Sequence, residues 1–178
     1  MDALLIVDMQ VGLLNGDPKH DLPDVIDRIN RLAASVRAQS GIVIFIQHCG
    51  DAGDDFEPQS PGWALLPELV RDPADVVVQK SMNDPFAGAE LQARLGRIAP
   101  DRVLVTGWAT DLCVDATVRS AVSNQHNVVV VTDAHTLSDR PHLDAVSIMR
   151  HHHWVWCNLI AQKPVRLAAT DELVPSMT

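Results

Sequence analysis

The chain has 178 residues, which is enough for one α/β domain that buries about 70% of its unfolded surface but short for two independent domains. Apolar residues make up 47% of the chain, the formal net charge is −9, and no Lys- or Arg-rich run occurs. This balance argues against a nucleic-acid or anionic-membrane surface, so we expect neither as a partner.

The three cysteines, Cys49, Cys113 and Cys157, are odd in number and widely spaced. They show no C-x-x-C metal spacing and imply no disulfide framework. Reduced thiols favour a cytoplasmic location. The first residues, MDALLIVD, carry an acid at position 2 and only a short apolar run, so we expect neither a signal peptide nor a membrane span there.

Apolar runs and helical periodicity alternate along the chain. The runs are continuous rather than alternating, which is typical of parallel strands covered on both faces. The predicted strands are Ala3–Val7, Ile42–Gln47, Val76–Gln79, Arg102–Thr106 and Val128–Thr132, with Val165–Val174 as a candidate last strand. The predicted helices are Leu22–Gln39, Ala87–Arg97, Asp111–Ser123 and Pro141–Ile160. This order predicts one domain over residues 1–178, a three-layer α/β/α sandwich with a mostly parallel sheet of about six strands.

The longest irregular stretch, HCGDAGDDFEPQSPGW, follows the second strand. A loop of this length inside a compact domain is usually a functional lid or disordered. It leaves the carboxyl end of a strand, where open α/β sheets bind ligands. We interpret it as a lid in which Trp63 lines a pocket, with a plain surface excursion as the alternative. Its acidic part, residues 51–57, would favour a cationic substrate.

Three reactive side chains stand at equivalent places in three strand units. Asp8 ends LLIVD, Lys80 ends VVVQK, and Cys113 follows VLVTGWATDL. Parallel strands would bring all three to the carboxyl edge of the sheet. Each residue also has a non-catalytic explanation: a turn cap, a strand-end charge and an inert buried thiol. Their joint placement favours a site.

The segment after Gly107 reads as a helix start. Thr110 or Asp111 is expected to be its N-cap, which places Cys113 in the first turn. Unpaired N–H groups and the positive dipole end would stabilise a thiolate there. The same N–H groups would hold a tetrahedral oxyanion.

The elements LLIVDMQ, the strand-end Lys80, GWATDLCVDATVRSA and VVVVTDA resemble the isochorismatase-like cysteine hydrolase family, in order and spacing, over nearly the whole chain. The resemblance implies a Cys-Asp-Lys triad in which Cys113 is the nucleophile, Asp8 the general base and Lys80 the stabilising cation. It also implies a cis peptide bond between Trp108 and Ala109. The oxyanion hole would then be formed by the N–H groups of Ala109 and Cys113.

The resemblance further implies hydrolysis of a small-molecule amide-type C–N bond through a thioester on Cys113, with no cofactor. The sequence does not identify the substrate. Two alternatives stay open: hydrolysis of an ester or vinyl ether on the same scaffold, and a catalytically silent homologue. The possible substrate pocket comprises His48, Trp63, Phe86 and Trp108.

No metal site is expected. The metal-binding nicotinamidase branch of the family has D-x-H after the second strand, whereas Gln47 stands here in place of the Asp. The run His151–His153 cannot converge on one ion, because consecutive helical residues point about 100° apart. It is expected to pack or to form a subunit interface. The remaining histidines expected in loops or on the surface are His20, His126, His135 and His142.

A homo-oligomer, either a dimer or a tetramer, is implied by the family resemblance and is also expected from the C-terminal helix. Trp154 and Trp156 lie about 200° apart on a helix, so both cannot face one core. One of them must face a loop, solvent or another subunit, and exposed aromatic area often marks an interface.

Overall fold

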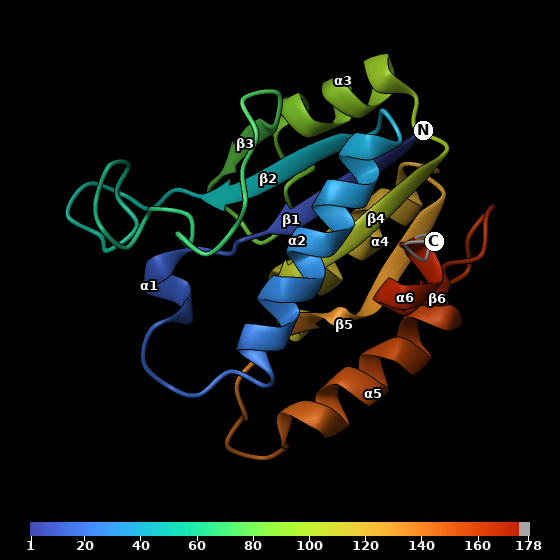
Figure 1. Cartoon of the computed structure of the whole chain (residues 1–178). Coiled ribbons are helices and arrows are strands. Elements are labelled where there is room, and N and C mark those ends of the chain that lie inside the picture. The colour runs from blue at the N-terminus through green and yellow to red at the C-terminus, as the bar shows by residue number, and fades with distance from the viewer. Residues whose placement is uncertain (175–178) are drawn as a thin grey trace.

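The structure, a computed structural model, describes residues 1–174. Six parallel strands form one sheet in the order β3-β2-β1-β4-β5-β6 (Figure 1). The strands are β1 Asp2–Val7, β2 Ile42–His48, β3 Val76–Lys80, β4 Arg102–Trp108, β5 Val128–Thr136 and β6 Arg166–Ala168. The predicted three-layer α/β/α sandwich is confirmed. The single domain predicted for residues 1–178 includes residues 175–178, which lie outside the described residues.

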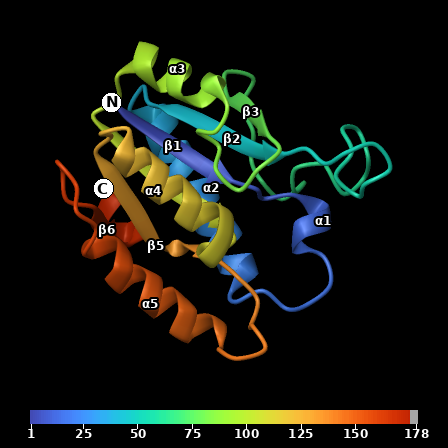
Figure 2. The ribbon, with the colours of Figure 1, turned by 180° about the vertical axis from the view of Figure 1, so that it is seen from behind.

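Helices cover both faces of the sheet, with α2 on one face and α4 and α5 on the other (Figures 1 and 2). The helices are α1 Val11–Leu14, α2 Leu22–Ala38, α3 Ala89–Ile98, α4 Asp115–Ser123, α5 Ala145–Cys157 and α6 Thr170–Leu173. The last long helix begins later than predicted because Asp144 caps it, accepting a hydrogen bond from the Ser147 N–H at 2.8 Å.

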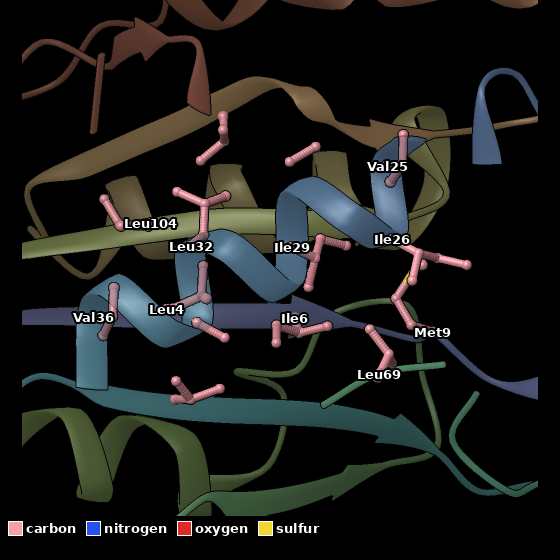
Figure 3. Packing of buried hydrophobic residues seen from close by; sticks show 14 of the residues in the cluster. Leu4, Ile6, Met9, Val25, Ile26, Ile29, Leu32, Val36, Leu69 and Leu104 are labelled. Carbon is pink, nitrogen blue, oxygen red and sulfur yellow. The ribbon is translucent and has the colours of Figure 1, made fainter. Parts of the chain in front are cut away.

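One face of α2 is apolar and packs against β1, β2, β4 and β5. Ile29, Leu32 and Val36 are almost completely buried, and Figure 3 shows them over Leu4 and Ile6. Burying a side chain of this size contributes about 1.5–3 kcal/mol. A second cluster fills the opposite face, which explains why the strands read as continuous apolar runs.

The C-terminal part of the sheet differs from the prediction in two ways. The segment expected as a strand over residues 165–174 forms only the short β6 and then α6. Strand β5 continues to Thr136, beyond the predicted end at Thr132, because pairing with β4 resumes after a register shift. His135 then pairs with Gly107 and is completely buried, so its predicted loop or surface position is wrong.

The long loop between β2 and β3 has no helix or strand but is fixed along part of its length (Figure 1). Backbone hydrogen bonds join Val11 N to Ala64 O and Gly12 N to Gly62 O, each at 2.9 Å. A Cβ at Gly12 would lie 2.8 Å from the Phe56 ring, so only glycine allows this approach. The loop is therefore attached to the β1–α1 connection at the carboxyl edge of the sheet.

The two tryptophans of α5 separate as helical geometry predicts. Trp156 is completely buried, whereas Trp154 is 67% exposed. Association of this exposed face with another copy stays a prediction. None of the helices within residues 1–174 has the length and apolarity that crossing a bilayer requires.

Candidate active site

The structure brings Asp8, Lys80 and Cys113 together at the carboxyl edge of the sheet, as the sequence predicted. We call these three residues the catalytic cluster. Lys80 Nζ lies 2.6 Å from Asp8 Oδ2 and 3.5 Å from Cys113 Sγ. The same ammonium donates a hydrogen bond to the Met82 carbonyl at 3.0 Å. Lys80, at the end of β3, thus uses all three of its donors: on Asp8 after β1, on the segment that follows β3, and on the nucleophile candidate.

Asp8 leaves β1 in a left-handed backbone conformation, with a φ of 50°. Its N–H donates to the Ile46 carbonyl at 3.0 Å, so the chain turns while still attached to β2. On the other side, Gly107 of β4 pairs with Val7. A Cβ at Gly107 would stand 2.2 Å from Val7 O, and the φ of Gly107 is 115°. Glycine is required there for β4 to approach the Asp8 turn.

One oxygen of Asp8 is left without a partner. Oδ2 pairs with Lys80, but Oδ1 is buried and makes no hydrogen bond to any of residues 1–174. A buried acceptor without a partner is unfavourable and rare, and such atoms are concentrated where chemistry needs them. Oδ1 is therefore free to accept a proton from a group in the cavity.

The electrostatics keep the thiol of Cys113 protonated at rest. Burial, and next to it the negative charge of Asp8, raises the pKa of Cys113 to about 12. Burial also raises the pKa of Asp8, and the charge of Lys80 opposes that rise only in part. The preformed thiolate suggested by the helix start is not favoured. The cluster instead holds a neutral thiol beside a carboxylate of increased basicity.

The turn that carries Cys113 is a π-helical turn, Thr110–Val114, rather than the first turn of an α-helix. Both the Leu112 and Val114 N–H groups donate to the Ala109 carbonyl, at 3.0 and 3.1 Å. The expected N-cap at Thr110 or Asp111 is wrong, since neither side chain caps this turn.

Thr110 and Asp111 hold the turn to other elements instead. Thr110 Oγ1 is hydrogen-bonded to His135 Nδ1 of β5 at 2.8 Å. Asp111 accepts two hydrogen bonds from Arg140, at 2.7 and 2.8 Å, and this pairing lowers the pKa of Asp111. The Thr-Asp pair of the motif therefore fixes the turn from two neighbouring segments.

The peptide bond between Trp108 and Ala109 is cis, as the family resemblance implied. Ala109 is completely buried, and its N–H makes no hydrogen bond to any other group of residues 1–174. This donor is therefore available to an oxyanion, which agrees with the role that the resemblance assigned to it.

A cavity of about 130 Å³ opens beside the thiol. Asp8, Cys113 and Ala109 line it, and the rest of its walls come from Leu13, His48, Asn83, Trp108 and Leu112.

His48 and Trp108 thus stand where the sequence placed them, but Trp63 and Phe86 lie outside the walls of this cavity. The Trp63 indole N–H donates to Cys49 Sγ at 3.2 Å, and Trp63 lines a different hollow from the one beside Cys113. Phe86 packs in the apolar cluster on the α3 and α4 side, with its ring 5.9 Å from that of His126.

Asn83 is a wall residue that the sequence did not single out. Cys113 Sγ donates to its Oδ1 at 3.5 Å. Its position three residues after Lys80, at the end of a strand, was the available signal. Leu13 and Leu112 carry no such signal, because apolar residues beside turns are common.

Within residues 1–174, no group of three or more His, Cys, Asp or Glu side chains is arranged to hold a metal ion. Gln47 donates to the Trp63 carbonyl and lines a different hollow from the one His48 lines. In the His151–His153 run, His153 pairs with His135 and His152 bonds to its own helix at Ile148 O. His152 and His153 thus pack within the chain, one of the two roles expected for the run, whereas His151 is exposed.

Comparison with known proteins agrees with this arrangement. The sequence model of the family described as "Isochorismatase domain" matches residues 2–156 of this chain. The chain belongs to the isochorismatase family of hydrolases. A solved isochorismatase family protein superposes with a TM-score of 0.84 at 27% identity, covering 94% of this chain and 98% of that one.

Two curated relatives of this family member are named for their reactions. Streptothricin hydrolase of Streptomyces noursei is 34% identical over 142 residues, which are 79% of this chain and 51% of that protein. The chain therefore spans about half the length of that relative. The ureidoacrylate amidohydrolase RutB of Stutzerimonas stutzeri is 27% identical over 169 residues, with 74% of this chain and 68% of that protein covered.

Proposed function

We propose that this protein hydrolyses an amide-type C–N bond of a small molecule through a thioester on Cys113. The observation that carries the proposal is the catalytic cluster itself. A buried ammonium lies within hydrogen-bonding reach of both a protonated thiol and a carboxylate that has one free buried oxygen. This is the nucleophile, base and cation set that acyl transfer to a thiol requires.

The first half of the reaction forms the thioester. Asp8 Oδ1 takes the thiol proton as Sγ attacks the amide carbonyl carbon. The resulting oxyanion accepts hydrogen bonds from the N–H groups of Ala109 and Cys113. Asp8 then donates its proton to the leaving nitrogen, the C–N bond breaks, and the amine departs.

The second half releases the acid. A water molecule attacks the thioester while Asp8 takes one of its protons. The C–S bond breaks, the thiolate recovers that proton from Asp8, and the carboxylic acid leaves. The raised pKa of Asp8 suits the first proton transfer of each half, because a more basic carboxylate accepts a proton from the thiol or from water more readily.

Lys80 keeps this exchange possible inside the protein. Its ammonium lies against both Asp8 and the sulfur, so it stabilises whichever of the two is ionised during proton transfer. Without it the single negative charge of the cluster would be buried and unpaired.

The amide assignment is supported by the relatives. Both streptothricin hydrolase and the ureidoacrylate amidohydrolase are similar to this chain over at least 74% of its length. The cavity of about 130 Å³ suits the small reacting end of a substrate rather than a bulky acyl group. We propose a small-molecule substrate on these grounds.

The test is a screen of small amides, ureides and carbamates, with esters included to detect the alternative bond type. Purified protein is compared with Cys113→Ala and with Cys157→Ala, a matched removal of an exposed thiol. We expect Cys113→Ala to lose activity by about 10³-fold or more while Cys157→Ala keeps it. Trapping of an acyl adduct on Cys113 by mass spectrometry would identify the thioester. Full activity of Cys113→Ala would refute the proposal.

A further inference from the structure

A buried polar chain stands behind the turn that carries Cys113. Thr110 Oγ1 is hydrogen-bonded to His135 Nδ1 at 2.8 Å, and His135 Nε2 to His153 Nε2 at 2.9 Å. The rings of both histidines contact Trp156, with centroids 5.4 and 5.9 Å away. We call Thr110, His135, His153 and Trp156 the histidine cluster. It joins the π-helical turn, strand β5 and helix α5.

Both ring nitrogens of His135 are hydrogen-bonded, and the histidine cluster is neutral. Two facing Nε2 atoms can share only one proton, so one histidine donates and the other accepts. Whichever tautomer His135 adopts, the hydroxyl of Thr110 supplies the complementary role at Nδ1, because a hydroxyl both donates and accepts. Burial lowers the pKa of His135 to about 3 and also lowers that of His153, which keeps both rings uncharged at neutral pH.

The location of Thr110 connects this cluster to the chemistry. Thr110 directly follows Ala109, whose N–H has no partner among the described residues, and precedes Cys113 by three positions. Thr110 is completely buried, and its hydroxyl is hydrogen-bonded to His135. Displacement of Thr110 would therefore shift the oxyanion donor and the thiol together.

We propose that His135, supported by His153, is a positioning residue that holds Thr110 and thereby sets the geometry of the Ala109 N–H and Cys113. The inference rests on the proposed function. His135 touches neither the thiol nor the cavity, so its effect passes through Thr110. A displacement of about 1 Å at a reacting group costs up to about a hundredfold in rate.

The test uses p-nitrophenyl acetate in single-turnover reactions with protein in excess over ester. The release of p-nitrophenolate is measured, and the rate of Cys113→Ala is subtracted as the background from other thiols. His135→Leu removes the bond to Thr110, whereas His135→Asn keeps an amide near the position of Nδ1. Thr110→Val and Thr110→Ser form a second pair, without and with the hydroxyl. His126→Leu, which removes a half-buried histidine bonded to Gln92, is the matched control.

We expect His135→Leu and Thr110→Val to slow the Cys113-dependent rate about ten- to a hundredfold. His135→Asn and Thr110→Ser should stay within about threefold of wild type, and the double variant His135→Leu with Thr110→Val should be no slower than the slower single one. Melting temperatures of all variants are recorded, since rescue by the conservative variant at equal stability separates positioning from mere folding.

A wild-type rate in His135→Leu, or equal slowing in His135→Leu and His135→Asn, would overturn the inference while leaving the proposed function intact. A wild-type rate equal to that of Cys113→Ala would overturn both, because there would then be no reactive geometry to position.

Discussion

The catalytic cluster and the histidine cluster are both buried polar groups near the carboxyl edge of one sheet, but they are built on opposite principles. In the catalytic cluster a carboxylate and an ammonium are paired, and one acceptor, Asp8 Oδ1, has no partner within residues 1–174. In the histidine cluster every ring nitrogen of His135 is bonded and no charge is present. The first is arranged to react, the second to stay fixed.

The two clusters also couple to pH with opposite signs. The pKa of Asp8 is raised, so the folded protein keeps this proton where the unfolded chain has lost it, and Asp8 stabilises the fold in acid but not at neutral pH. The pKa of His135 is lowered, so the unfolded chain takes up a proton that the folded protein refuses. At neutral pH the ionised Asp8 of the catalytic cluster therefore lowers the stability of the fold. The uncharged His135 of the histidine cluster does not lower it at that pH.

Removing Asp8, the proposed base of the catalytic cluster, gives the largest expected effect on rate. Asp8→Asn keeps the size of the side chain but cannot accept the thiol proton, and general-base catalysis contributes about 10²–10⁴-fold. The wild-type rate should fall as pH drops through the raised pKa of Asp8, because the base becomes protonated. Steady-state rates across the acid range test both points. If Asp8→Asn kept the wild-type acid limb, a different group would be the base.

Removing the cation should destabilise the same cluster. Lys80→Ala leaves Asp8 as an unpaired buried charge, at a cost of about 3–5 kcal/mol. Urea denaturation measures the loss, and Arg94→Ala, which breaks an exposed ion pair with Glu90, should cost less than about 1 kcal/mol.

A compensating variant sharpens this comparison. In Asp8→Asn with Lys80→Met both charges are removed together, so most of the lost stability should return without activity. A double variant no more stable than Lys80→Ala would show that packing, not charge, is what Lys80 provides.

How far the sequence predicted these clusters depends on where each signal lies along the chain. Asp8 and Lys80 each end a continuous apolar run, and Cys113 follows another, so strand order alone brought them to one edge. His135 was placed wrongly because Thr132 and Asp133 interrupt the apolar run and hide the continuation of β5.

The π-helical turn was also beyond sequence reasoning. Thr110 and Asp111 are both residue types that commonly cap helices. In the folded chain they bind His135 and Arg140 instead, and the sequence does not show that these partners lie nearby. For a similar reason, only two of the four predicted pocket residues, His48 and Trp108, line the cavity. Trp63 and Phe86 are suitably apolar, but hydrogen bonding and ring packing direct them elsewhere.

The histidine cluster should affect how the stability of the protein changes with pH in the acid range. Between pH 6.5 and about 3 the unfolded chain protonates His135 and the folded protein does not. Stability should therefore fall with decreasing pH by up to about 1.4 kcal/mol per pH unit from this residue. His135→Asn removes that dependence, so its stability should decline less steeply, as measured by urea denaturation at several pH values. His142→Asn, at an exposed histidine, controls for loss of an imidazole, and an equal slope in wild type and His135→Asn would contradict the prediction.

The smallest expected effect is that of a chelator, which should leave the rate unchanged. A hydrolytic zinc needs about three protein ligands and an open position for water. Gln47 donates to the Trp63 carbonyl on the far side of its strand from the cavity, and His48 alone supplies one ligand at the thiol. His153 has its Nε2 engaged by His135, so the histidine run offers no second site. Asp8 serves every proton transfer of the proposed reaction, and the N–H groups of Ala109 and Cys113 polarise the carbonyl. Prolonged dialysis against a chelator, followed by metal analysis and the p-nitrophenyl acetate assay, tests this. A rate that the chelator abolishes and zinc restores would show that the two clusters do not suffice for the chemistry.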